Sequence, residues 1–293
     1  MALSGGGEPN IKVMLNFLTF LVAPKLSYYL KTPLLDPTAT QFFDQVIRQA
    51  IKDRKTNNNK KNDFIDLFAE AIRDFEKKGT KEVFSESEIE DIIVSNCLLL
   101  FIAGQDTTSS ALSATSHFLA KHQDIQEKLF QEIKDAIDEN DGDPNLEYNK
   151  LHNLRFLDCV IKESLRLWGL NFFDRTCSKD YHLTDMNFTV PKGMHIQIAG
   201  AGIMREEKYY KNPLNFDPES HFEDDSGSSL YPPSFMAFGQ GPRNCIGMRF
   251  AYTMVRLETA HLSCTFSNKH CFSQIEPTRE FFFSNLTLSK LAR

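Results

Sequence analysis

Cys245 lies in a glycine-rich loop whose residue types suit a rigidly held metal ligand. The loop reads Phe238-Gly239-Gln240-Gly241-Pro242-Arg243-Asn244-Cys245-Ile246-Gly247. Three glycines and a proline indicate backbone conformations that few side chains permit, passing close to a flat and bulky group. An apolar run from Met248 to Cys264 suits a helix, and the start of a helix stabilises a nearby thiolate. The loop therefore predicts a soft, electron-rich ligand, and the alternative is a buried cysteine in a tight turn.

A second polar cluster falls within a long predicted helix. Residues 85–88, Ser-Glu-Ser-Glu, form a capping box, and the helix should run to about His117. It is apolar on all sides from Cys97 to Ala103, which predicts that its middle lies deep in the protein. The polar run Gly104–Ser110 follows, and its hydroxyls could bond back to the helix and bend it. A buried carboxyl beside a hydroxyl, Asp106 and Thr107, suits proton transfer; a water-filled kink is the alternative.

Other elements must position these two clusters. Asp36-Pro37 is a helix start signal, and it predicts a helix that runs to about residue 55. Apolar periodicity predicts further helices over 63–77, 121–138 and 153–168. Gly169 would be the C-cap of the last one. Short alternating runs between Arg175 and Met204 predict the strands of a small sheet. The apolar stretch Ile11–Leu30 is interpreted as a pair of short core helices, and the alternative is a membrane-facing patch.

The loop around Cys245 resembles the haem-binding loop of the cytochrome P450 superfamily, the haem-thiolate monooxygenases. All fixed positions of the family pattern Phe-Gly-x-Gly-x-Arg-x-Cys-x-Gly are filled. The segment Ala103–Thr108 is similar to the family's distal helix motif. The resemblance implies a mainly α fold, the C-terminal part of the cytochrome P450 fold, with a long central helix, a helix bundle and a small β-sheet.

The resemblance also implies roles for individual residues. Cys245 would be the axial ligand of the iron of haem b, with Phe238, Gly239, Gly247 and Ala103 beside the cofactor. Arg243 and Arg175 would bind the haem propionates, although surface solvation is the alternative for Arg175. Asp106 and Thr107 would hold waters and deliver protons for cleavage of the O–O bond. The substrate pocket would include Phe101, Leu170, Phe172, Phe173 and Ser284; by composition alone, the segments 170–173 and 283–285 simply contribute core aromatics.

Glu163 and Arg166 are neighbours on one helical face and fall where the family keeps a Glu-x-x-Arg pair that locks the loop around the thiolate. Taken alone, such a pair is usually an exposed ion pair worth under ~1 kcal/mol. The family's third partner is the arginine of a Pro-Glu-Arg-Phe motif. This chain has Ser220 and His221 there, so the lock is in doubt unless His221 takes the arginine's place.

Charge and composition restrict the partners. The chain has 293 residues and a net charge of −6 with no basic arm, which disfavours nucleic-acid binding. Its six cysteines form no Cys-x-x-Cys pair, which predicts a reducing compartment. No apolar run reaches the roughly 18 residues of a transmembrane helix. There is no dinucleotide fingerprint, so the resemblance implies electrons from NADPH through NADPH-cytochrome P450 reductase. It also implies a lipophilic small-molecule substrate and a place on the cytoplasmic face of the endoplasmic reticulum membrane.

We expect an unstructured start at 1–10 and a single cytochrome P450-like domain over 11–293, lacking its N-terminal anchor and first helices. An exposed apolar helix would then promote aggregation. Three other functions remain open. The first is a truncated, catalytically inactive haem-thiolate remnant. The second is a haem-thiolate enzyme that rearranges peroxides, which Asp106 and Thr107 disfavour. The third is a cysteine hydrolase using Cys245, for which no histidine has a supporting motif.

Overall fold

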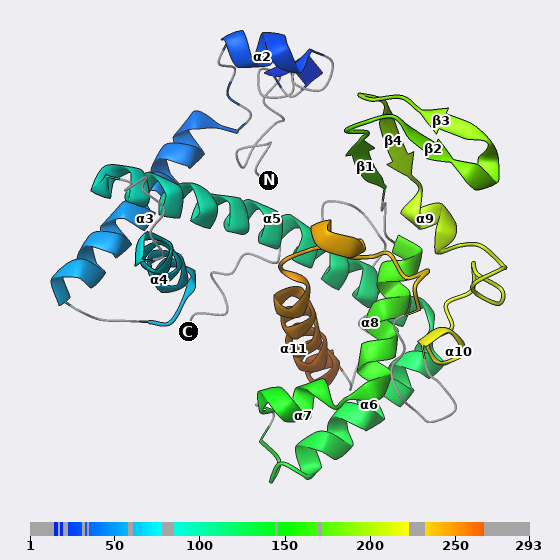
Figure 1. Cartoon of the computed structure of the whole chain (residues 1–293). Helices are drawn as coiled ribbons and strands as arrows, with labels where there is room; N and C mark the ends of the chain where they lie inside the picture. The colour runs from blue at the N-terminus through cyan, green and yellow to red at the C-terminus, as the bar shows by residue number, and fades with distance from the viewer. Residues whose placement is uncertain are drawn as a thin grey trace. The chain divides into compact units, whose positions relative to one another are not determined.

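The computed structural model describes residues 23–30, 35–57, 61–77, 85–143, 146–168, 172–222 and 232–266, together with residues 15, 16, 18, 19 and 33. The chain divides into two compact units, residues 1–107 and 108–293. The described part is mainly helical with a small amount of β structure, as predicted (Figure 1). None of the described helices combines the length and the apolar character needed to cross a bilayer.

Figure 1 labels the α-helices and the strands in chain order. The first unit holds α2 (Pro24–Leu30), α3 (Pro37–Asn57), α4 (Phe64–Lys77) and most of α5 (Glu86–Lys121). The second unit continues with α6 (Gln123–Asp138), α7 (Tyr148–His152), α8 (Arg155–Trp168), β1 (Phe173–Thr176), β2 (Tyr181–Leu183), η1 (Thr184–Met186), β3 (Phe188–Val190), β4 (His195–Ile198), α9 (Gly200–Ile203), α10 (Pro218–Phe222), η2 (Gly241–Arg243) and α11 (Met248–Phe266).

Local capping signals begin the helices of the first unit where the sequence predicts. The Asp36 carboxylate accepts hydrogen bonds from the amides of Thr38 and Ala39, at 2.8 and 3.1 Å, at the start of α3. Ser85 and Glu88 form the predicted capping box of α5, with the Ser85 amide donating to Glu88 Oε2 at 2.8 Å. These bonds satisfy amides that have no partner within the helix.

The first unit has its own core, formed by α3, α4 and the first part of α5. Its buried members are Ile47, Ile51, Ile93, Val94 and Cys97. The prediction that α5 is deeply buried from Cys97 to Ala103 is wrong for this structure, because Leu99 is 62% exposed and Phe101 is 55% exposed. In the first unit, α3 and α4 cover one face of α5. Because α5 is apolar on all sides here, its uncovered face exposes apolar side chains to solvent.

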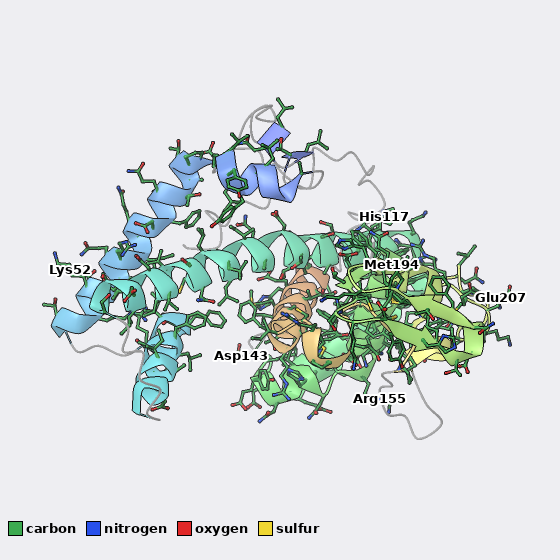
Figure 2. The ribbon with its side chains drawn as sticks, turned by 45° about the horizontal axis from the view of Figure 1, so that its top comes forward. Lys52, His117, Asp143, Arg155, Met194 and Glu207 are labelled. Atoms are coloured by element: carbon green, nitrogen blue, oxygen red, sulfur yellow. The ribbon has the colours of Figure 1, made fainter. Side chains whose placement is uncertain are left out.

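The second unit has a larger core in which α11 packs against α6, α7 and α8 (Figure 1). The last turns of α5 contribute to it: the rings of Phe118 and Phe216 stack with centroids 4.7 Å apart. His117 is labelled in Figure 2, where side chains crowd together, and its ring lies 5.9 Å from that of Trp168. The core is therefore built largely from aromatic and branched apolar side chains on helices.

The helix predicted over 153–168 is preceded by a short helix that the sequence pattern missed. The turn at Asn153 separates α7 from α8, and its amide bonds back to the carbonyls of Asn149 and Lys150. The carboxylate of Glu132 on α6 then accepts the amides of Phe156 and Leu157, at 2.8 and 2.9 Å, in the first turn of α8. A carboxylate from another helix thus starts α8, and no local signal reveals such a cap.

The strands form two separate antiparallel pairs instead of one sheet. β1 pairs with β4, so that Arg175 lies opposite Ile196, and β2 pairs with β3. Asn187 adopts a left-handed conformation, φ +45°, in the turn between β2 and β3. β2 and β3 thus form a hairpin. β1 and β4, which flank this hairpin in the sequence, pair with each other. The predicted residues 1–10, Gly169, Leu170 and Ser284 lie outside the described part of the chain, and the single domain over 11–293 stays a prediction.

Candidate functional site

The loop from Phe238 to Gly247 is a closed turn that presents Cys245 to solvent. The Cys245 amide donates to the carbonyl of Phe238 at 2.8 Å, and η2 fills the interior of the turn. Gly239 and Gly241 have φ of +72° and +78°, in the region where a side chain is strained. Cys245 is exposed and precedes the first residue of α11, Met248, by three positions. The loop therefore holds an accessible thiol on a fixed backbone, as a ligand site requires.

Gly239 is also fixed by a neighbouring ring. A Cβ atom at this position would lie 3.1 Å from Cε1 of Phe173. Phe173, at the start of β1, was predicted to line the substrate pocket, and the structure places its ring against this glycine. The glycine therefore brings the backbone of the loop into contact with β1.

Replacing Gly239 with alanine is expected to destabilise the second unit by about 1–3 kcal/mol, from left-handed backbone strain and from contact with Phe173. Gly241→Ala is a matched control, because Gly241 has a similar φ and a Cβ atom added there would have no neighbour within 4 Å. Urea unfolding measures both variants. The Phe173 contact is contradicted if Gly239→Ala costs no more than Gly241→Ala, or if Phe173→Leu does not partly rescue it.

The two predicted propionate-binding arginines are both exposed. Arg243 ends η2, two residues before Cys245, and Arg175 lies on β1, where its Nη1 donates to the carbonyl of Asp174 at 2.8 Å. Phe172 is 65% exposed, whereas the ring of Phe238 is half-buried against Tyr252, with centroids 5.0 Å apart. Exposed guanidiniums suit the carboxylates of a ligand, and that of Arg243 lies in the same loop as the exposed thiol.

The predicted proton-transfer residues lie in the first unit, which ends at Thr107. The Thr107 hydroxyl donates to the carbonyl of Ala103 at 2.6 Å, which is the predicted bond back to the helix. Asp106 and Ala103 are exposed. The prediction of a buried carboxyl at Asp106 is therefore wrong here, because the covered face of α5 turns away from this position.

Glu163 and Arg166 form a fully buried ion pair on α8, each 0% exposed. Arg166 Nε donates to Glu163 Oε2 at 2.6 Å, and Nη2 donates to Oε1 at 2.8 Å. The interpretation as an ordinary exposed pair is therefore wrong. We call these two residues the α8 lock, and their parallel bonds are the strong two-point geometry of guanidinium and carboxylate.

The α8 lock also holds the chain segment that follows α9. The Nη1 atom of Arg166 donates to the carbonyls of Met204 and Pro213, both at 2.7 Å, and Nη2 reaches that of Asn215 at 3.2 Å. The Asp217 amide donates to Glu163 Oε1 at 3.0 Å. The lock therefore supplies the hydrogen-bond partners of three backbone carbonyls and one amide, which would otherwise be buried without partners.

His221 contacts the α8 lock, as its predicted substitution for the missing arginine requires. Its Nδ1 lies 3.0 Å from Glu163 Oε1, and its Nε2 lies 2.8 Å from the carbonyl of Lys211. A carboxylate and a carbonyl only accept hydrogen bonds, so both ring nitrogens donate and the ring is an imidazolium. Burial alone lowers the pKa of His221, but its bonds to Glu163 and to the Lys211 carbonyl outweigh burial and raise that pKa. Ser220 instead bonds to Asp217 and is exposed.

Because its folded-state pKa is raised above 6.5, His221 stabilises the second unit fully below pH 6.5 and loses this contribution as pH rises through the folded pKa. Urea unfolding between pH 6.5 and 9 should show stability falling with pH, and His221→Gln should remove that fall. Burial lowers the pKa values of His117 and His152, so their effects fall below pH 6.5. An unchanged slope in His221→Gln would contradict the assignment.

Comparison with known proteins identifies the family. The cytochrome P450 family model matches residues 10–291. The chain is 36% identical over 266 residues to cytochrome P450 9e2 of Blattella germanica, covering 86% of this chain and 48% of that protein. It is 34% identical to cytochrome P450 9b1 of Drosophila melanogaster, covering 81% and 46%, and 31% identical to cytochrome P450 6B1 of Papilio polyxenes, covering 79% and 47%.

The chain thus spans about half the length of the curated relatives it matches. The family match includes the Cys245 loop, the α8 lock and α5 together, which are the elements on which the sequence resemblance depends. The chain belongs to the cytochrome P450 family.

Proposed function

We propose that this chain supplies the haem-binding part of a monooxygenase that inserts one atom of O₂ into a lipophilic organic substrate. The observation that carries the proposal is the exposed Cys245 thiol, held in a closed glycine turn directly before α11. The residues present fit haem b: a soft sulfur donor suits its iron, and the exposed Arg243 and Arg175 suit its carboxylates. When bound, haem supplies the activation of O₂.

The side chains of the chain would bind the cofactor and move protons. Cys245 would hold the iron, with Phe238, Gly239, Gly247 and Ala103 beside the ring and Arg243 and Arg175 on the propionates. The Thr107 hydroxyl already donates a hydrogen bond to the Ala103 carbonyl, so its oxygen is left to accept a hydrogen bond from a water. Asp106, next to it, would exchange protons with that water.

The remaining features of the whole protein are also proposals. Electrons would come from NADPH through NADPH-cytochrome P450 reductase at the cytoplasmic face of the endoplasmic reticulum membrane. Phe101, Leu170, Phe172, Phe173 and Ser284 would line the pocket of the substrate. The α8 lock would keep the loop around Cys245 in place, with His221 as its third member.

A second candidate is a haem-thiolate protein without turnover. The apolar surface of α5 favours it, because Leu99 and Phe101 are exposed. Exposed apolar surface of this kind promotes association.

One experiment tests both candidates. The chain is titrated with haem, reduced, and exposed to carbon monoxide, and the difference spectrum is recorded. A thiolate-type band together with oxidation of a lipophilic substrate, when NADPH and the reductase are added, supports the monooxygenase. The same band without substrate oxidation supports the inactive haem protein, and the absence of any thiolate-type band overturns both.

A further inference from the structure

A second buried ion pair connects α8 to α11, the helix that follows the Cys245 loop. Asp158 on α8 and Arg256 on α11 are each 5% exposed, and Arg256 Nη2 donates to Asp158 Oδ1. The other oxygen of the Asp158 carboxylate lies 2.7 Å from Lys162 Nζ. Arg256 Nη1 lies 3.0 Å from His152 Nδ1 on α7. The guanidinium of Arg256 is therefore held from α8 and from α7.

The same guanidinium is connected to the Cys245 loop by contacts through two aromatic rings, those of Tyr252 and Phe238. The central carbon of the Arg256 guanidinium lies 5.2 Å from the ring centroid of Tyr252, one turn earlier on α11, within the range of a cation–π contact. The Tyr252 ring packs on Phe238, with centroids 5.0 Å apart and planes inclined by 42°. Tyr252 itself is buried. Asp158, Arg256, Tyr252 and Phe238 thus form one continuous chain of contacts.

Phe238 is the residue to which Cys245 is hydrogen-bonded. Its carbonyl accepts the Cys245 amide at 2.8 Å, while its side chain packs on Tyr252. We infer that Asp158 and Arg256 are positioning residues of the Cys245 loop, which they hold by fixing Tyr252 beneath Phe238; as a role in ligand positioning, this rests on the proposed function.

Two observations separate this contact from the α8 lock. Glu163 and Arg166 bind the segment 204–217 and also the ring of His221. Asp158 instead binds Arg256 on α11. The two pairs therefore restrain different segments from one helix. A guanidinium also suits this task better than an ammonium, because its planar fork can bind acceptors at its edge while its face lies on a ring.

Amide hydrogen exchange of the unliganded chain tests the inference, because it needs no haem. In Arg256→Met and Asp158→Asn, the Cys245 amide should exchange about tenfold faster relative to the buried Ile133 amide of α6, since its bond to Phe238 loses support. Arg256→Lys, which keeps the charge opposite Asp158, should restore part of the protection. The matched control is Glu132→Gln, which weakens a partly buried carboxylate contact between α6 and α8 and should change both amides alike.

Tyr252→Leu provides a second variant that leaves Asp158 and Arg256 in place, and it should give the same local change at Cys245. The inference is overturned if the Cys245 amide accelerates no more than that of Ile133 in Arg256→Met and Tyr252→Leu. Haem titration with the carbon monoxide spectrum is then applied to the same variants. A wild-type chain without a thiolate-type band defeats the proposed function, while the exchange ratio still decides whether the loop is positioned from α8.

Discussion

Replacing Arg166 with methionine is expected to lower the free energy of unfolding of the second unit by about 3–5 kcal/mol, which is the usual cost of removing one partner of a buried ion pair. The variant leaves the buried Glu163 carboxylate without its guanidinium. It also leaves the carbonyls of Met204 and Pro213 without their donor. Domains are stable by about 5–15 kcal/mol in total, so the variant should lose a large share of its stability. Urea unfolding followed by circular dichroism measures the loss.

Two further variants show whether the loss comes from burial and geometry. Arg166→Lys keeps the charge but cannot make the two-point contact, so it should remain clearly destabilised. Arg48→Met is the matched control, because Arg48 pairs with Asp44 on α3 with both side chains more than one-third exposed. It should cost under ~1 kcal/mol. Equal losses in Arg166→Met and Arg48→Met would contradict the structural role of the α8 lock.

Replacing Cys245 with serine is expected to abolish the thiolate-type carbon monoxide spectrum while leaving the fold intact. The Cys245 side chain is exposed, so its sulfur contributes little to packing, and the free energy of unfolding should change by less than about 0.5 kcal/mol. A hydroxyl is a poor replacement for a soft thiolate ligand. The spectrum after haem titration and a urea unfolding curve check the two parts of the prediction.

Cys177→Ser is the control for Cys245→Ser, since Cys177 is a partly exposed thiol on the same unit, next to β1. It should keep the thiolate-type spectrum. If Cys245→Ser keeps that spectrum, or if Cys177→Ser loses it, Cys245 is not the ligand and the proposed function fails with it.

The sequence was most informative where structure depends on near neighbours. The caps at Asp36 and Ser85 and the glycine turn before α11 follow from local hydrogen bonds and backbone preferences, and they appear as predicted. The exposure of Leu99 and Phe101 could not be predicted, because an apolar helix does not specify which of its faces will be covered. The predicted start of α5 was therefore correct, while the predicted burial of its middle was wrong.

The candidate site shows the same division. Glu163 and Arg166 could be found from their spacing, but their burial depends on carbonyls contributed by residues about 40 to 50 positions later. His221 was visible as the residue before Phe222, yet only the structure shows its second partner, the Lys211 carbonyl. Asp158 and Arg256 carry no sequence signal, since they are 98 positions apart. Roles toward haem and substrate remain predictions for all of these residues.

The separate core of the first unit has a consequence for synthesis on the ribosome. Its buried members, from Ile47 to Cys97, all lie in the first third of the chain. A nascent chain can therefore bury them before Cys245 has been translated, because domains generally fold in the order in which they emerge. The Cys245 loop would then form after the core of the first unit is already compact.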